Sequence, residues 1–199
     1  WEGKYASKIN FIDNKISNAP EFEKLLDDAI PTLKNGKQPK SIQDLGRVFD
    51  QEYAFEAQKA FDNEDFSKLP HLKQFYEQGY EIVSGQVRIK TGVTIDKSIE
   101  VRPDVLLFKI NQSTGRINKT GTIWKECKIR PSSPPTENQS TAFDLLKGGS
   151  ISKNQLEFEV LSDKIALRDI GLTKGSTIGI EKINQVSIDQ GLIKIISIY

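Results

Sequence analysis

The pattern of apolar and polar residues divides the chain into a helical first part and a strand-rich remainder. In the first 79 residues, apolar side chains recur at helical spacing, and acidic residues and prolines stand where helices begin. The pattern predicts one helix after Asn18 that ends near Pro31 or Gly36. Two further helices are predicted, from the N-cap residue Ser41 to about Asn63 and from Pro70 to Gln78.

From Gly79 onward the residues are those typical of strands and turns. β-branched and aromatic residues stand between turn signals, and the last fifty residues are again rich in them. A helix from Thr136 to Lys147, ended by Gly148-Gly149, interrupts the strands. The strands predicted before this helix cover residues 80–90, 97–101, 104–111 and 121–130.

This order of elements favours an α/β (α+β) fold. At 199 residues, the chain can bury one sizeable core, so a single domain is expected. Within it, residues 1–79 should be mainly helical, residues 80–147 should form the central core, and residues 148–199 should be strand-rich.

The composition indicates a soluble globular protein. Hydrophobic residues make up 37% of the chain and charged residues 28%. No apolar run approaches the roughly 20 residues needed to cross a bilayer, and the N-terminus lacks the layout of a signal peptide. Because the chain starts with Trp1 and contains no Met, we expect it to be a segment of a longer protein.

The single histidine, His71, excludes several kinds of catalysis. Histidine-pair ribonucleases, HNH-type nucleases, HExxH metalloproteases and multi-histidine zinc sites all need more imidazoles than the chain has. A Ser-His-Asp triad is unlikely without a Gly-x-Ser-x-Gly nucleophile turn, and His71 fits a helix start or a surface position. Any catalysis should therefore use carboxylates, lysine and a metal ion.

Positive charge is concentrated in the middle of the chain. The net charge is only +1, but residues 88–130 contain ten Lys and Arg against four Asp and Glu. That stretch carries +6 and leaves −5 for the rest. This distribution is a weak indication of a polyanionic partner.

A carboxylate and an ammonium group share one face of an apolar strand. In the segment Ile123 to Ile129, the period of two places Trp124, Glu126 and Lys128 on the same face. Burying two such charges is costly unless they are paired or bind something. Trp124 is expected to pack in the core, and Cys127 to fill space on the opposite face.

A second acid can be placed opposite the first. Asp104 begins the apolar strand 104–111, and an antiparallel hairpin would pair it with Glu126 if the turn were centred on residue 115. Gly115 lies in the turn Asn111 to Arg116. Two close carboxylates favour a hard divalent cation such as Mg²⁺, and Lys128 beside them could position water or stabilise a phosphate.

These residues resemble the PD-(D/E)XK nuclease superfamily of restriction-endonuclease-like proteins. Pro103-Asp104 matches its PD element and Glu126-Cys127-Lys128 matches (D/E)XK. The resemblance implies a central mixed sheet flanked by helices. It implies that Asp104 and Glu126 bind a divalent metal ion, with Mg²⁺ expected and Mn²⁺ or Zn²⁺ as alternatives. It also implies that Lys128 assists the attacking water, and that the substrate is DNA, with RNA as the alternative.

Many members of this superfamily place a further acid on an early helix. On the helix from Ser41, Glu52 and Glu56 lie about 20° either side of Leu45, on the stripe of Ile42 and Phe49. Either acid could complete the metal site, with Glu56 preferred, or could be a solvated residue or a salt-bridge partner. Glu81 is a weaker candidate. Gln139, early in the helix after the motif, could reach the substrate or simply start its helix.

The resemblance allows two biological settings. The chain could be the C-terminal nuclease toxin of a large secreted bacterial protein, as in contact-dependent growth inhibition, acting in the target-cell cytoplasm and blocked by a cognate immunity protein. It could instead be a cytoplasmic Type II restriction endonuclease, which would be a homodimer. Neither setting involves a membrane partner. An alternative of another class is a non-catalytic module for binding nucleic acid or protein, in which Glu126 and Lys128 only form a salt bridge.

Overall fold

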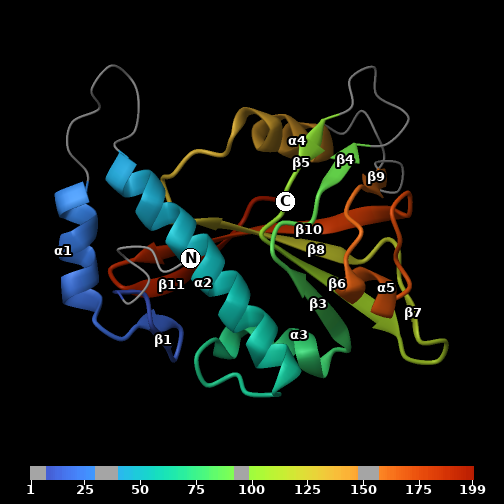
Figure 1. Ribbon diagram of the computed structural model, residues 1–199, viewed down its shortest axis with the longest axis horizontal. Coiled ribbons are helices and arrows are strands. Elements are labelled where there is room, and N and C mark those ends of the chain that lie inside the picture. Colours follow the sequence, from blue (N-terminus) through green and yellow to red (C-terminus); the bar gives the residue numbers. More distant parts are fainter. Residues whose placement is uncertain (1–7, 30–39, 92–98, 148–156) are drawn as a thin grey trace.

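The protein has an α/β fold in which helices cover a large mixed sheet (Figure 1). The computed structural model describes residues 8–29, 40–91, 99–147 and 157–199. Within these ranges, no helix has both the length and the apolar character needed to cross a membrane. The predicted fold class is confirmed.

Four strands form the centre of the sheet, in the order β3, β6, β8 and β10. β3 and β6 are antiparallel, as are β6 and β8, whereas β8 and β10 are parallel. Parallel neighbours need a crossover connection, and helix α4 lies between β8 and β10 in the sequence. The bounds are β3 Tyr80–Ser84, β6 Val105–Asn111, β8 Thr122–Lys128, α4 Glu137–Lys147 and β10 Thr177–Asp189.

Further strands extend the sheet beyond β10. β11 pairs antiparallel with β10, and β2 and β1 follow it. A two-residue strand, β7, pairs with the end of β6. The bounds are β11 Leu192–Ser197, β2 Lys15–Ile16, β1 Phe11–Ile12 and β7 Arg116–Ile117.

The strand predicted over residues 80–90 is wrong, because the chain breaks there into β3 and β4. Gly85 and Gln86 have positive φ angles of 82° and 55°, which turn the backbone out of the sheet. β4 then pairs with β5 and β9, and β9 pairs with the first residues of β10. The bounds are β4 Ile89–Thr91, β5 Glu100–Val101 and β9 Glu157–Val160.

The helical part follows the predicted pattern closely. Helix α1 starts after Asn18, whose carbonyl accepts the amide of Phe22. Helix α2 begins one residue before Ser41, so Ser41 lies in its first turn and is not the N-cap that we predicted. The predicted ends near Pro31 or Gly36 and at Gly148-Gly149 lie outside the described residues. The bounds are α1 Ala19–Ala29, α2 Lys40–Asp62, a 3₁₀ turn Pro70–Leu72, α3 Lys73–Glu77 and the unpredicted α5 Ile165–Asp169.

Strand β8 divides two hydrophobic cores. Ile123 and Cys127 pack in the core beneath α2, which crosses one face of the sheet (Figure 1). Trp124 packs on the other face, against Phe143 of α4. The alternation predicted from the period of two is therefore present, and it sends Cys127 to the opposite face from Trp124.

The predicted register between β6 and β8 is also present. Val105 pairs with Lys125 and Leu106 with Trp124, and one further step brings Asp104 opposite Glu126. Our prediction that the turn would be centred on Gly115 is wrong.

Next to the turn, Ile110 pairs with Ile117. If the ladder continued in that register, Leu107 would pair with Thr120. Leu107 instead pairs with Ile123, because residues 118–121 form an irregular bend in which the backbone N–H of Gly121 donates to the carbonyl of Asn118 over 3.2 Å. The bend compensates for the shifted turn.

Candidate active site

Asp104, Glu126 and Lys128 line one pocket of about 340 Å³, as the sequence register implied. Asp50 of α2 and Gln139 of α4 line the same pocket. The pocket therefore brings together side chains from both helices that flank the sheet and from its two central strands.

Asp104 is fixed by backbone contacts on both sides. It is only 4% exposed, and its Oδ2 accepts a hydrogen bond of 2.8 Å from the backbone N–H of Cys127. Its own carbonyl accepts the amide of Gly85, at the break between β3 and β4. The acid is therefore held at the start of β6, where the sheet splits.

Glu126 is 3% exposed and accepts three side-chain hydrogen bonds. The ammonium of Lys128 and the amide of Gln139 donate to Oε1, the former over 3.1 Å. The indole N–H of Trp124 donates to Oε2 over 3.0 Å. Charge-assisted bonds of this kind are what a buried carboxylate requires.

Gln139 joins helix α4 to the site. Its Oε1 accepts the ammonium of Lys128 over 3.0 Å and the amide of Thr136 over 2.9 Å. The backbone N–H of Gln139 donates to the hydroxyl of Thr136, which stands just before the helix. Gln139 therefore stabilises the helix start, as one alternative predicted, and also contacts two pocket residues. Its contact with a substrate stays a prediction.

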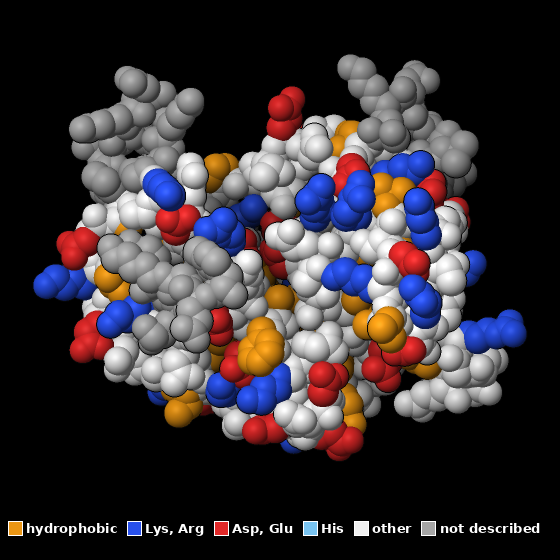
Figure 2. Space-filling view, in the orientation of Figure 1, with side chains coloured by type: hydrophobic (Ala, Val, Ile, Leu, Met, Phe, Trp, Pro, Cys, Tyr) orange, Lys and Arg blue, Asp and Glu red, His pale blue; other side chains and the backbone are white. Residues whose placement is uncertain are grey.

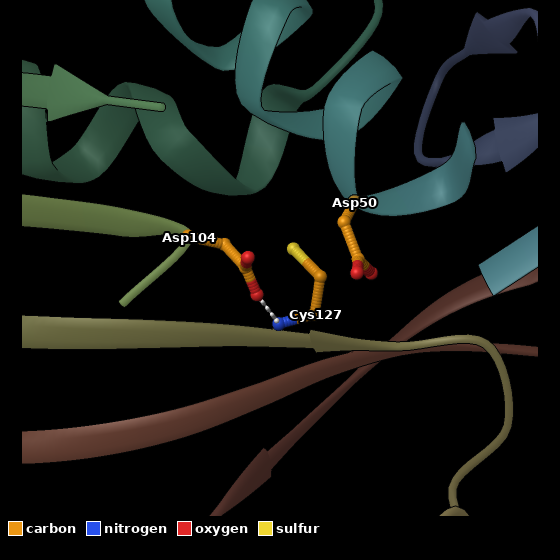
Figure 3. A group of neighbouring side chains, drawn as sticks. All are labelled: Asp50, Asp104 and Cys127. Atoms are coloured by element: carbon orange, nitrogen blue, oxygen red, sulfur yellow. Dashed lines mark hydrogen bonds between the residues drawn. The ribbon is translucent and has the colours of Figure 1, made fainter. Parts of the chain in front are cut away.

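Asp50 is a pocket residue that we did not predict. Figure 3 shows it extending from α2 toward Cys127 and Asp104. The ligand atoms of these three side chains all lie within 4.8 Å of one another. Asp50 thus occupies the position that the sequence analysis assigned to an acid on the early helix.

The acids predicted for that role lie elsewhere. Glu56 pairs with Lys68, with 2.7 Å between Oε1 and Nζ, and lines a separate small pocket. Glu52 is half-buried, and burial, together with Glu56, raises its pKa. Glu81 is exposed on β3. None of the three lines the pocket of Asp104 and Glu126.

The buried stripe of α2 explains why Asp50 was missed. Ile42, Leu45 and Phe49 suggested a stripe centred on Leu45, but the buried face turns toward Tyr53 and the alanines that follow. Asp50 lies on that face, since Ala54, Ala57 and Phe61 follow it by four, seven and eleven residues. That helical spacing was the signal in the sequence. It was hidden because alanines mark an apolar face only weakly.

Burial raises the pKa of all three carboxyl groups, and neighbouring acids add to the shift of Asp50 and Asp104. Burial, followed by the charge of Glu126, raises the pKa of Asp50 to about 8, against the opposing effect of Lys128. Burial raises the pKa of Asp104 well above its usual range, and Glu126 and Asp50 add to this effect. The pKa of Glu126 is also raised by burial, although its three hydrogen-bond donors oppose the shift. Negative charge in the pocket is therefore undercompensated by Lys128.

This donor set fits a hard divalent cation. Asp50 and Asp104 supply carboxylate oxygens close enough to share one ion, and Glu126 lines the same pocket. Carboxylate oxygens are the ligands that Mg²⁺ and Mn²⁺ prefer. Cys127 contributes a buried thiol whose pKa is raised well above normal by burial and then by Asp104, Asp50 and Glu126. A protonated thiol is a poor ligand, so the oxygens would be the main ligands of such an ion.

Half of the cations in the basic stretch form ion pairs. Five of its ten cations pair with acids within the part of the chain that the structure describes. On the face drawn in the space-filling view, Lys and Arg side chains are interspersed with Asp and Glu side chains (Figure 2). The pairs are Arg88 and Arg102 with Glu100, Lys90 with Glu159, Lys128 with Glu126, and Arg130 with Glu23 and Asp27.

Comparison of the chain with protein-family models, with curated proteins and with solved structures gives no match.

Proposed function

We propose that the protein is a divalent-metal-dependent endonuclease that hydrolyses phosphodiester bonds. The observation that carries this proposal is the convergence of Asp50, Asp104, Glu126 and Lys128 on one pocket. When ionised, the three acids would outweigh one lysine, and a divalent cation would balance that negative charge. The pocket is also open to solvent at Arg102, which is 59% exposed and can meet a phosphate of the substrate.

Each pocket residue has a role in this proposal. Asp50, Asp104 and Glu126 hold the ion, and Lys128 orients the attacking water or contacts the scissile phosphate. Water forms a bond to phosphorus as one P–O ester bond breaks. A bound divalent ion supplies Lewis-acid chemistry, stabilising the negative charge that develops on the phosphoryl oxygens.

The non-catalytic alternative requires only a salt bridge between Glu126 and Lys128. That ion pair is present at 3.1 Å, but it accounts for one acid of three. Asp50 and Asp104 remain beside it with raised pKa values, an arrangement that favours a functional site over a structural one. Metal binding separates the two functions.

Cleavage of nucleic acid tests the proposal. Plasmid DNA, tRNA and rRNA are incubated side by side with the protein in Mg²⁺ or Mn²⁺. We expect plasmid to be nicked, and Asp104→Ala and Glu126→Gln to abolish cleavage while the proteins stay folded. If these two variants bind metal and cut like the unmodified chain, the nuclease proposal is wrong. Cleavage of RNA alone would keep the nuclease and change its substrate.

For the biological setting we propose the toxin domain, on the resemblance of Pro103-Asp104 and Glu126-Cys127-Lys128. Such a domain is expected to be active as a monomer and to be inhibited by a cognate immunity protein. A Type II restriction enzyme would be a homodimer that cuts at fixed sites. Light scattering of the purified protein, together with the banding pattern of a digested plasmid, separates the two settings.

A further inference from the structure

Trp124 is a buried core residue behind the pocket, and its one polar atom contacts a proposed metal ligand. It is fully buried, and its ring packs edge-on against Phe143 with 5.2 Å between ring centroids. Its indole N–H donates to Oε2 of Glu126 over 3.0 Å. The sequence analysis assigned Trp124 only to core packing.

The two oxygens of Glu126 are used unequally. A carboxylate offers about four acceptor sites, two on each oxygen. Lys128 and Gln139 take both sites on Oε1. On Oε2, Trp124 is the only donor among the residues that the structure describes. Oε2 is therefore the oxygen with capacity left for a cation, and it is also the oxygen that the indole holds.

We propose that Trp124 is a positioning residue, which orients Glu126 so that Oε2 is presented to a divalent cation. The inference rests on the proposed function. The strand period of two brings the indole N–H within reach of Glu126, and the ring is buried beside Phe143. Partners of this kind commonly control metal affinity as strongly as the ligands do.

Mn²⁺ affinity, measured by titration calorimetry on the full chain, tests the proposal. Trp124→Phe keeps an aromatic ring but removes the N–H, so the affinity should fall roughly 10- to 100-fold. Phe143→Leu is the matched control, because it loosens packing on the same indole and leaves the hydrogen bond. Its affinity should stay close to that of the unmodified chain.

Two further measurements cover a Trp124→Phe protein that fails to fold. The first replaces Trp124 with benzothienylalanine, which has the shape of the indole with sulfur in place of the N–H, and should weaken Mn²⁺ binding by the same factor. The second uses Trp1→Phe, which leaves Trp124 as the only tryptophan. Its emission should shift as Mg²⁺ is added, and Glu126→Gln should remove that shift.

The outcomes separate the two proposals. If the unmodified chain binds Mn²⁺ and the benzothienylalanine protein binds it equally well, Trp124 does not position the ligand, while the metal site stands. If the unmodified chain binds no divalent ion, the nuclease proposal and the role of Trp124 are both overturned.

Discussion

The backbone N–H of Cys127 donates to Oδ2 of Asp104 over 2.8 Å, which fixes the first acid of the pocket to the strand that carries the second. Cys127 lies between Glu126 and Lys128 in the sequence, so this one hydrogen bond holds Asp104 next to both of these residues. This contact lies just beyond the last ladder pair of β6 and β8, where the side chain of Asp104 takes a backbone N–H of β8. The geometry of the pocket is thus set by the backbone before any metal binds.

Asp50→Asn should stabilise the metal-free protein at neutral pH. The carboxyl has a pKa of about 8 in the folded protein and its ordinary value of 3.8 when unfolded. Binding of a proton to this carboxyl group stabilises the folded protein. This stabilisation is complete below pH 4 and is lost as pH rises toward 8. Between these values the unmodified chain should lose up to roughly 1.4 kcal/mol per pH unit relative to Asp50→Asn. Urea unfolding in EDTA measures this.

The same pair of proteins tests the metal site. At pH 8, Mg²⁺ should raise the unfolding midpoint of the unmodified chain by mass action and leave Asp50→Asn nearly unchanged. An equal rise in both proteins would show that Asp50 does not hold the ion.

Lys128→Met should lower the rate of cleavage without weakening metal binding. Lys128 is a cation beside the site, with 3.1 Å between its Nζ and Oε1 of Glu126. Removing it takes away a group that acts on water or phosphate, which is worth roughly 10²- to 10⁴-fold. It also removes a charge that repels the ion. Plasmid nicking and Mn²⁺ calorimetry are measured together, and a parallel loss of both would contradict the assigned role.

Glu56→Gln and Glu52→Gln should leave cleavage intact, in contrast to Asp50→Asn. Glu56 is paired with Lys68. Neither Glu56 nor Glu52 lines the pocket of Asp104 and Glu126. Loss of this partly exposed ion pair should cost no more than about 1 kcal/mol of unfolding free energy. Plasmid nicking by the three variants at equal concentration decides which helix acid belongs to the site. Loss of cleavage in Glu56→Gln would restore the prediction made from the sequence.

His71 should make the fold sensitive to acid. Its ring contacts the hydroxyl of Tyr53 over 2.8 Å and the side chain of Asn14, and burial, followed by the charge of Lys125, lowers its pKa to about 3. In the unfolded chain the imidazole of His71 takes up a proton near pH 6.5. In the folded chain it stays neutral down to about pH 3. Stability is therefore lost as pH falls through this window, by up to roughly 1.4 kcal/mol per unit.

Since His71 is the only histidine, His71→Gln isolates its effect. Unfolding of both proteins from pH 7 to pH 5 should show a smaller slope in the variant. Equal slopes would mean that the ring is protonated in the folded state as readily as in the unfolded chain.

Lys125→Met should stabilise the protein. The side chain is fully buried, its ammonium makes no hydrogen bond within the described residues, and it lies 4.7 Å from the ring centroid of Phe75. Burial lowers its pKa to about 8 from 10.5, so the charge costs roughly 3 kcal/mol below pH 8. This cost falls as pH rises from 8 to 10.5. Urea unfolding at pH 7 should show the gain, and Lys125→Arg, which keeps the charge, should show none.

Local sequence patterns predicted the elements and part of the site because the physical rules behind them are short-ranged. The period of two placed Trp124, Glu126 and Lys128 on one face of β8, since alternation follows from strand geometry alone. The pairing of Asp104 with Glu126 was also predicted, although the turn was misplaced. The irregular bend at residues 118–121 restored a register that the turn at Asn111 and Arg116 would have shifted.

The sequence by itself determined the α/β class, the boundaries of most elements within a few residues, and the meeting of Asp104, Glu126 and Lys128. Only the tertiary structure decided that Asp50 is the acid from α2, because which face of a helix meets a sheet depends on packing between residues distant in sequence. It also decided that Glu56 pairs with Lys68 and that Trp124 holds Glu126. Helical periodicity places side chains around an axis, but packing of the whole chain decides which of them lie against β6 and β8.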